Sequence, residues 1–215
     1  MIAIKVKFAS LMSSIYIVAN GSNQSGKTTT AFNLAMCFAT LAQKTLFINL
    51  NKNNWAGRVC SPDGQAKALN LFLDYSILAD AEADYSAYDQ VIINCPVHRA
   101  KQVLEGFSGS AEVIVPVELE YYGMNQLPSF FKIALQSGIR LRGILPVMWR
   151  KESEGSNAVL LKLQQDFGKD IFIPAIQRNY YLARQKEFHL FDLPGLTEKA
   201  AVTYLNLATE LLKKN

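Results

Sequence analysis

Residues 15–35 read "IYIVANGSNQSGKTTTAFNLA", and this stretch decides the expected fold. An apolar run typical of a buried strand passes through a glycine-containing loop into a segment with few helix breakers. The loop carries the pattern G-x-x-x-x-G-K-T from Gly21 to Thr28. Its two glycines let the backbone turn tightly, and loop amides at the positive end of a helix suit a phosphate group. We therefore expect phosphate binding at this strand–loop–helix junction.

Candidate phosphate ligands follow from this pattern. The Lys27 ammonium is expected to reach the β- and γ-phosphates of ATP or ADP, and the Thr28 hydroxyl is expected to bind Mg²⁺. The full set of predicted cradle residues is Gly21, Ser22, Asn23, Gln24, Ser25, Gly26, Lys27, Thr28 and Thr29.

Strand and helix patterns alternate along the rest of the chain. Strands are predicted at residues 14–19, 44–50, 68–73, 89–95, 111–117, 142–149 and 171–174. Helices are predicted at residues 28–42, 76–86, 99–107, 125–138, 157–168 and 198–214, with Pro128 in a first turn. Near-continuous apolar strands between helices predict a mostly parallel, doubly wound sheet with helices on both faces, an α/β fold. Ligands of such sheets lie beyond the carboxyl ends of the strands.

Composition narrows the class of protein. The chain has 215 residues, of which 50% are hydrophobic and 19% are charged, which suits one domain over 1–215. Residues 1–14 are a candidate N-terminal extension, since Met12 is an alternative start. The sequence has no run of about eighteen apolar residues, so we expect no transmembrane helix. The net charge of +4 is too small to argue for nucleic acid by itself.

Two further features bear on the compartment. A signal peptide is the less favoured interpretation of the first residues, because its apolar part would include the strand that feeds the loop. The three cysteines have no metal-like spacing, so we expect reduced, buried thiols in a cytoplasmic protein. They are Cys37, Cys60 and Cys95.

Five blocks fall in the order and spacing of a known family. They are "IYIVANGSNQSGKTTTAFNLAMCFA", "KTLFINLNKN", "YDQVIINCP", "AEVIVPVELEYYGMNQL" and "IPAIQRNYYLARQKEFHLFDLPG". The chain resembles the ParA/MinD family of deviant Walker A P-loop ATPases, and within it the short, Soj-like ParA proteins that position plasmids, chromosomes or other cargo. The resemblance implies an ATP-dependent homodimer, non-specific DNA binding, and hydrolysis stimulated by a ParB-like or cargo-adaptor partner.

The sequence departs from that family at four positions. The family loop usually reads K-G-G-x-G-K-T, and its first lysine, which reaches the partner subunit's ATP, is Ser22 here. The family's catalytic and metal-supporting aspartates are Asn49, Asn51 and Asn94. An amide has no negative charge and is a poor proton acceptor, whereas Mg²⁺ prefers anionic oxygen. We therefore expect nucleotide binding with weakened Mg²⁺ binding and weak or absent hydrolysis.

The resemblance assigns roles to residues near the carboxyl end of the chain. It places Met148, Pro174 and Arg178 among the nucleotide-binding residues. It also places Arg178, Arg184 and Lys186 near a DNA-binding face, where cations bind phosphates without reading sequence.

The sequence offers a few candidates to replace the missing groups. Arg150 and Lys151 are candidates for the lost lysine, although a solvated turn is the favoured interpretation of this pair. Glu118 and Glu120 follow a strand at the expected end of the sheet and are weaker candidates for the lost acids. Three other acids are candidates for the same role, although the last of them precedes its strand and so lies at the wrong end: Asp63, Asp74 and Asp89.

Other interpretations remain open from the residues alone. One is a metabolic ligase of the same superfamily, similar to dethiobiotin or cobyrinate synthases, and another is an interaction module without nucleotide. Packing is favoured over membrane binding for the last helix, whose apolar side is followed by only two lysines. Surface or packing roles are favoured for the two histidines, His98 and His189.

Overall fold

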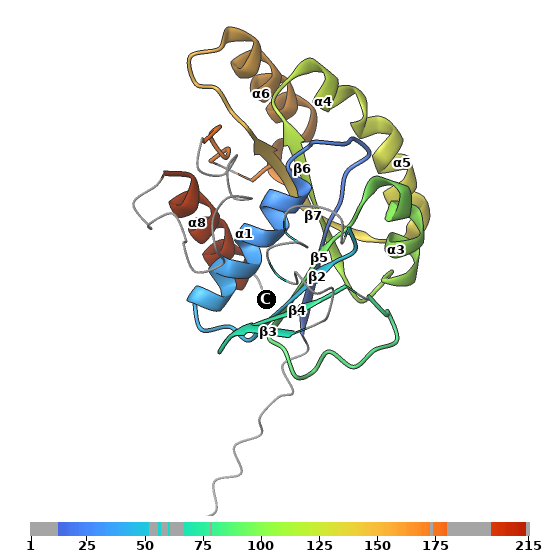
Figure 1. Ribbon diagram of the computed structural model, residues 1–215. Helices are drawn as coiled ribbons and strands as arrows, with labels where there is room; N and C mark the ends of the chain where they lie inside the picture. The colour runs from blue at the N-terminus through green and yellow to red at the C-terminus, as the bar shows by residue number, and fades with distance from the viewer. Residues whose placement is uncertain are drawn as a thin grey trace, which may run out of the picture.

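The computed structural model describes residues 13–51, 56, 60, 67–77, 79–172, 174–179 and 199–213. Its centre is a seven-stranded sheet with the strand order β3-β4-β2-β5-β1-β6-β7 (Figure 1). Every ladder is parallel except the one between β3 and β4, so the predicted mostly parallel sheet is confirmed. The strands are β1 (Ser14–Val18), β2 (Thr45–Asn49), β3 (Lys67–Asn70), β4 (Leu73–Ser76), β5 (Gln90–Asn94), β6 (Glu112–Glu118) and β7 (Arg140–Val147).

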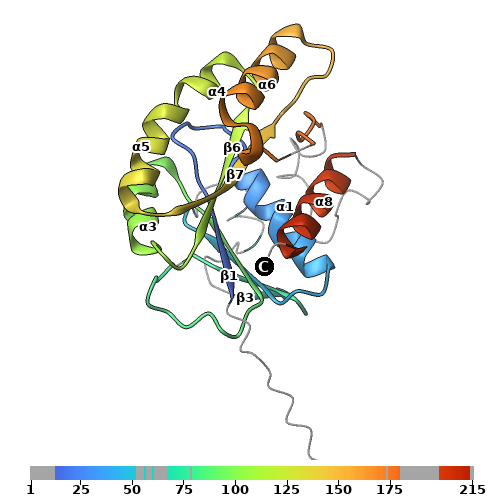
Figure 2. The same ribbon diagram turned by 180° about the vertical axis from the view of Figure 1, so that it is seen from behind.

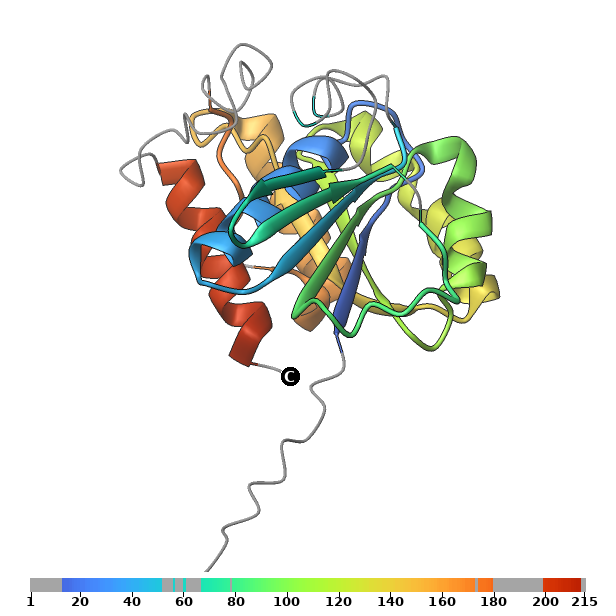
Figure 3. The same ribbon diagram turned by 60° about the horizontal axis from the view of Figure 1, so that its bottom comes forward.

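Helices cover both faces of the sheet (Figures 2 and 3). On one face lie α1 (Lys27–Thr40) and α8 (Lys199–Lys213). On the other lie α3 (Ala100–Gly106), α5 (Leu127–Ser137) and α6 (Glu154–Phe167), while α4 (Tyr121–Asn125) leads into α5. Short 3₁₀ turns, η1 (Val97–Arg99) and η2 (Gly168–Asp170), complete the described elements.

Alternation along the buried strands divides the core into two halves. Phe47 and Ile92 belong to the cluster under α1 and α8, whereas Ile48 and Ile93 belong to the cluster under α3 and α5. Successive side chains of a strand point to opposite faces of a sheet. Because both faces are covered, every residue of β2 and β5 is buried, which explains their near-continuous apolar sequences.

The last helix packs inside the protein, as predicted. The Tyr204 hydroxyl of α8 is buried and lies 3.0 Å from the Thr30 hydroxyl of α1. Leu207 and Leu211 lie on the same side of α8 and belong to the cluster that contains α1. Within the described part of the chain, no helix is both long and apolar enough to cross a membrane.

Two predicted strands have a different form in the structure. Residues 68–73, expected as one strand, lie in an antiparallel hairpin in which β3 and β4 flank a turn at residues 71–72. A last strand was expected at residues 171–174, and among the described ones (171, 172 and 174) the structure has an isolated bridge between Ile144 and Ile171. Pro174 follows this bridge and has no N–H with which to continue a ladder.

The helix predicted at residues 76–86 is wrong. Strand β4 continues to Ser76, and the described residues that follow form turns. The Asp80 and Asp84 carboxylates accept backbone N–H bonds from Glu82 (3.0 Å) and Ser86 (2.8 Å). Such local side-chain bonds compete with a helix, which is why this polar stretch turns instead.

Replacing Gly123 of α4 with alanine is expected to lower the free energy of unfolding by about 1–3 kcal/mol. A Cβ at this position would meet the Glu118 carbonyl oxygen at 2.3 Å, so the backbone before α4 must shift. Gly155→Ala in α6 is the matched control, because its Cβ would meet only Ser153 Oγ, at 3.9 Å. Urea unfolding of both variants checks this, and equal stabilities would contradict it.

Candidate phosphate-binding site

The phosphate loop leaves the carboxyl end of β1, as predicted, and ends at the start of α1. Its first residues are held by Asn20, which is fully buried. The Asn20 Nδ2 atom donates to the Pro116 carbonyl oxygen (2.6 Å), and its Oδ1 atom accepts from the Ser22 N–H (2.9 Å). Asn20 therefore joins the loop to β6, a role that the sequence pattern did not reveal.

The two loop glycines lie where side chains would collide. Gly26 has φ of 77°, a left-handed conformation, and a Cβ there would meet Val147 Cγ2 of β7 at 3.1 Å. A Cβ at Gly21 would meet Phe130 Cβ of α5 at 3.3 Å. The glycines thus let the loop lie against the neighbouring elements while α1 begins at Lys27.

Lys27 lies folded across the loop and is only 9% exposed. Its ammonium group donates to the Ser22 carbonyl oxygen and to Ser25 Oγ (3.2 Å). Burial lowers the pKa of Lys27 to about 8, because desolvation disfavours the charged form. A phosphate oxygen could therefore take the place of the Ser22 carbonyl oxygen or Ser25 Oγ as the acceptor of the Lys27 hydrogen bonds.

ATP affinity is expected to fall as the pH rises above about 8. The pKa of Lys27 is lowered to about 8 in the free protein, and a bound phosphate would raise it. Above about pH 8 the free amine is mostly neutral, so Lys27 must take up a proton when the nucleotide binds. The logarithm of the association constant should fall by up to about one per pH unit from there, and stay level below. Calorimetric titrations in buffers of different ionisation enthalpy measure this uptake, and a level affinity from about pH 7 to about pH 9 would contradict it.

The three predicted amides gather at the carboxyl ends of two adjacent strands. Asn49 and Asn94 end β2 and β5, are partners in the ladder, and are 0% and 2% exposed. The Asn94 Nδ2 atom donates to Asn49 Oδ1 (2.8 Å) and to Thr28 Oγ1 (3.2 Å). The Asn51 N–H donates to the same Asn49 oxygen (3.3 Å). The structure therefore brings the degenerate positions and the predicted metal ligand into one hydrogen-bonded network, of which Asn49 and Asn94 are the buried members.

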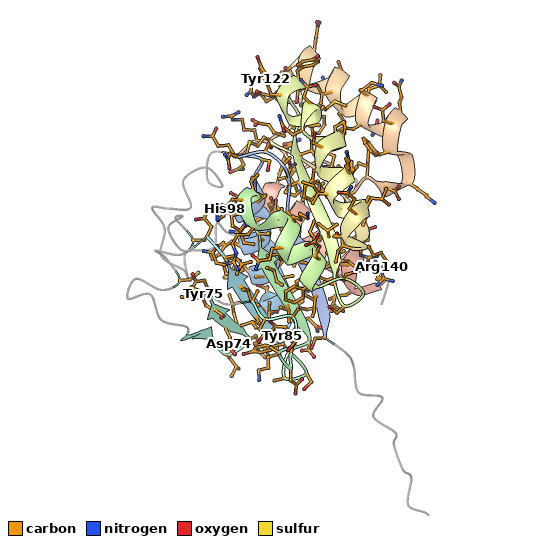
Figure 4. The ribbon with its side chains drawn as sticks, turned by 90° about the vertical axis from the view of Figure 1, so that its right-hand side faces the viewer. Asp74, Tyr75, Tyr85, His98, Tyr122 and Arg140 are labelled. Atoms are coloured by element: carbon orange, nitrogen blue, oxygen red, sulfur yellow. The ribbon has the colours of Figure 1, made fainter. Side chains whose placement is uncertain are left out.

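A cavity of about 380 Å³ opens over this network, and we call it the phosphate cavity. Two ionisable side chains are among its described lining residues, Lys27 and His98, and no carboxylate is. His98 belongs to η1 after β5 and is labelled in Figure 4. The remaining lining residues are Asn23, Gln24, Ser25, Gly26, Thr28, Thr29, Asn51, Pro96, Val97 and Met148. Only the position of η1 after β5 signals His98 in the sequence.

A second, mostly apolar cavity of about 150 Å³ adjoins the first, and we call it the apolar pocket. Both cavities are lined by Gly26, Thr29 and Met148. Arg178 also lines the apolar pocket, and its N–H donates to the Trp149 carbonyl oxygen (2.9 Å). The predicted residues Met148 and Arg178 are thus beside the loop, and their role in binding stays a prediction.

Pro174 is not among the described lining residues of either cavity. It lines a separate hollow of about 40 Å³ against α8, together with Phe172 and Leu207. The family resemblance suggested the nucleotide site for this residue, and that role stays a prediction. The predicted DNA-binding residues Arg184 and Lys186, together with His189 and Asp63, lie outside the described residues.

The candidate replacements for the lost groups have partners of their own. Arg150 forms an ion pair with Glu120, and both side chains are 45% exposed. Burial, and then the neighbouring Glu120, raise the pKa of Glu118, while Arg178 and Arg150 oppose that shift. Lys151 is exposed in the turn that follows. Arg150 is therefore already balanced by an acid, as the solvated-turn interpretation expects.

Two other acids lie away from the loop. The Asp74 carboxylate accepts from the Tyr88 hydroxyl (2.8 Å), and Figure 4 shows Asp74 at the far end of the molecule from Tyr122. Asp89 precedes β5 and accepts from the Lys44 N–H (2.7 Å), so its predicted position at the wrong end of the strand is confirmed.

The cysteines are free thiols, and two of the three are fully buried, Cys60 and Cys95. Burial raises the pKa of Cys37 and of Cys95 to about 12 in each case. Within the described ranges, no three His, Cys, Asp or Glu side chains gather into a metal-binding group.

Comparisons with known proteins agree with this geometry. No family model matches the chain. The chain is 24% identical to the chromosome partitioning protein ParA of Myxococcus xanthus, covering 94% of this chain and 88% of that protein. It is 25% identical to the chromosome-partitioning ATPase Soj of Thermus thermophilus, covering 92% of this chain and 94% of that one.

Solved structures share the fold. The MinD cell division protein of Aquifex aeolicus matches with a TM-score of 0.72 and 15% identity over 94% of this chain and 98% of its own. Cobyrinic acid a,c-diamide synthase from Mycobacterium smegmatis, with bound ADP and magnesium, matches with a TM-score of 0.70 and 19% identity over 94% and 95%. These likenesses show that the chain has the same α/β fold as those proteins. The chain is thus similar over most of its length to ParA and Soj proteins of chromosome partition.

Proposed function

We propose that this chain is a ParA-like nucleotide-binding protein of plasmid or chromosome partition, or of intracellular cargo positioning, that hydrolyses ATP slowly or not at all. Residues 1–215 would form one nucleotide-binding domain. One observation carries the proposal: a phosphate cavity with Lys27 and Thr28 in its wall lies over buried amides and carries no described carboxylate.

Nucleotide binding is supported by the two adjoining cavities. The loop amides and Lys27 suit the phosphates of ATP or ADP, and the apolar pocket beside them suits a base. Met148, which lines both cavities, and Arg178, which lines the apolar pocket, would contact the nucleotide. Ser22 to Thr29 would form the cradle.

Weak hydrolysis is supported by the chemistry of the strand ends. Phosphoryl transfer needs charge neutralisation and a positioned nucleophile. Asn49, Asn51 and Asn94 supply hydrogen bonds without a negative charge or an effective base. Mg²⁺ binding at Thr28 would be weakened for the same reason.

The remaining parts of the proposal concern partners. ATP would support a homodimer, although Ser22 replaces the lysine that reaches across it, and Arg150 is paired with Glu120. Arg178, Arg184 and Lys186 would bind DNA without sequence preference, and a ParB-like or cargo-adaptor protein would regulate the dimer. The protein would act in the cytoplasm, on the nucleoid where DNA binding is retained.

Solution mass measured without nucleotide, with ADP and with ATP tests the proposal, together with an assay of phosphate release. We expect an ATP-dependent dimer and negligible release. A mass that responds to neither nucleotide, with no binding at millimolar concentration by calorimetry, would refute it and favour an interaction module.

A metabolic ligase is the second candidate, favoured by the structural likeness to the Mycobacterium smegmatis synthase. At 19% identity this likeness concerns the fold alone. Such an enzyme would need acids for Mg²⁺, and the described cavity walls offer none. Fast phosphate release without a partner protein would favour this candidate.

A further inference from the structure

We propose that the site binds its nucleotide as the free anion, without a divalent cation, because the Asn94 amide replaces the ion that acids would otherwise hold beside Thr28. The inference rests on the proposed nucleotide binding and concerns the form of ligand that the site selects. It also predicts that the protein's nucleotide state does not follow the Mg²⁺ concentration.

The Asn94 amide connects three elements. Asn49 and Asn94 are ladder partners, and each lies two residues after a side chain of the core under α1, Phe47 and Ile92. Both amides therefore point toward α1, where Thr28 lies in the first turn. A primary amide has two N–H groups, and those of Asn94 are directed to Asn49 Oδ1 (2.8 Å) and Thr28 Oγ1 (3.2 Å). One neutral donor thus joins β2, β5 and α1.

This donor set does not fit Mg²⁺. The ion requires about six oxygen ligands at about 2.0–2.1 Å and is bound in proteins through carboxylates. The Thr28 oxygen accepts an amide N–H, so a cation on that oxygen would face a partial positive charge. Asn49 Oδ1 already accepts from Asn94 and from the Asn51 N–H. Binding the ion would break these hydrogen bonds, and no acid among the described lining residues would compensate.

The charge of the cavity wall favours the free nucleotide. Where acids line such a site, Mg²⁺ neutralises both the acids and the phosphates. Here Lys27 and His98 are the ionisable groups among the described lining residues. Free ATP carries about two more negative charges than its magnesium complex, so Lys27 and the loop amides attract it more strongly. No acid is among the described lining residues to repel that extra charge.

The decisive experiment is calorimetric titration of the wild-type protein with ATP and with ADP, in EDTA and in excess MgCl₂. We expect a dissociation constant in EDTA that is equal to or smaller than the one in MgCl₂. Binding that is about tenfold or more tighter in MgCl₂ would overturn this inference and leave the proposed function standing. No binding under either condition would overturn both.

A single substitution tests the part played by the amide. Asn94→Asp replaces the donor by a carboxylate of the same shape, so nucleotide binding should become about tenfold or more tighter with MgCl₂ than in EDTA. Asn206→Asp makes the same chemical change on the exposed side of α8 and should keep the wild-type pattern. An Asn94→Asp protein that folds and binds equally with and without MgCl₂ would overturn the role of the amide. The wild-type titration decides the proposal if that variant does not fold.

Discussion

Replacing both Asn49 and Asn94 by aspartate is expected to lower the free energy of unfolding by about 3–5 kcal/mol at neutral pH in EDTA. The two side chains are 0% and 2% exposed and lie 2.8 Å apart, from Nδ2 to Oδ1. Two carboxylates there would be desolvated and would repel each other without the donor that now joins them. Urea unfolding in EDTA and in MgCl₂ measures the loss and its partial recovery by the metal.

The pH dependence of this double variant has a definite sign. Burial and mutual repulsion raise the carboxyl pKa values above those of the unfolded chain. The folded state is then favoured most below about pH 4, and this contribution is lost as the pH rises through the raised values. The double variant should therefore approach wild-type stability in acid and depart from it at neutral pH.

A matched control separates burial from charge. Asn206→Asp together with Gln165→Glu adds two acids at exposed positions of α8 and α6. Surface changes of this kind alter stability by about 0.5 kcal/mol or less. A buried double variant as stable in EDTA as this control would show that the strand ends tolerate charge, and would remove the physical reason for the amides.

Replacing Lys27 by methionine is expected to weaken ATP binding by about 100-fold or more. Truncating one partner of a buried, hydrogen-bonded charge pair costs about 2–5 kcal/mol, and about 2.7 kcal/mol corresponds to 100-fold. Methionine keeps most of the apolar stem that packs in the loop, so the change chiefly removes the ammonium. Calorimetric titration of ATP compares the variant with wild type.

The control for this variant is Lys151→Met, which removes a lysine that is exposed in the turn after β7. It should leave the affinity within about threefold of wild type, since exposed charges are well screened. A Lys27→Met protein that binds as tightly as this control would show that the ammonium does not contact the phosphates. The proposed phosphate cradle would then be wrong.

Much of the fold was predictable because its signals are local. Apolar runs predicted β1, β2, β5, β6 and β7, and the periodic segments predicted α1, α3, α5, α6 and α8. The predictions failed in short polar segments, where side-chain hydrogen bonds to the backbone compete with helix formation. Residues 76–86 are of types compatible with a helix, but the Asp80 and Asp84 carboxylates accept hydrogen bonds from nearby backbone N–H groups and stabilise turns. The short α4 was likewise not separated from the loop that precedes it.

The candidate site was predictable in its parts and not in its contacts. The loop pattern identified Lys27 and Thr28, and the positions of the amides followed from the family resemblance. The role of Pro174 was expected from the resemblance, and a surface or packing role was favoured for His98. The structure places Pro174 beside α8 and His98, in η1 after β5, in the wall of the phosphate cavity, which are contacts between segments far apart in the sequence.

The sequence by itself determined the strand–loop–helix junction and the parallel α/β class, because turn chemistry and hydrophobic periodicity depend on residues close together in the chain. The tertiary structure alone decided that one amide joins two strands to the phosphate loop. Asn94 lies 45 residues from Asn49 and 66 residues from Thr28, and they meet because the sheet order places β5 between β2 and β1. Arg150 meets Glu120 across 30 residues for a similar reason, since β6 and β7 end side by side.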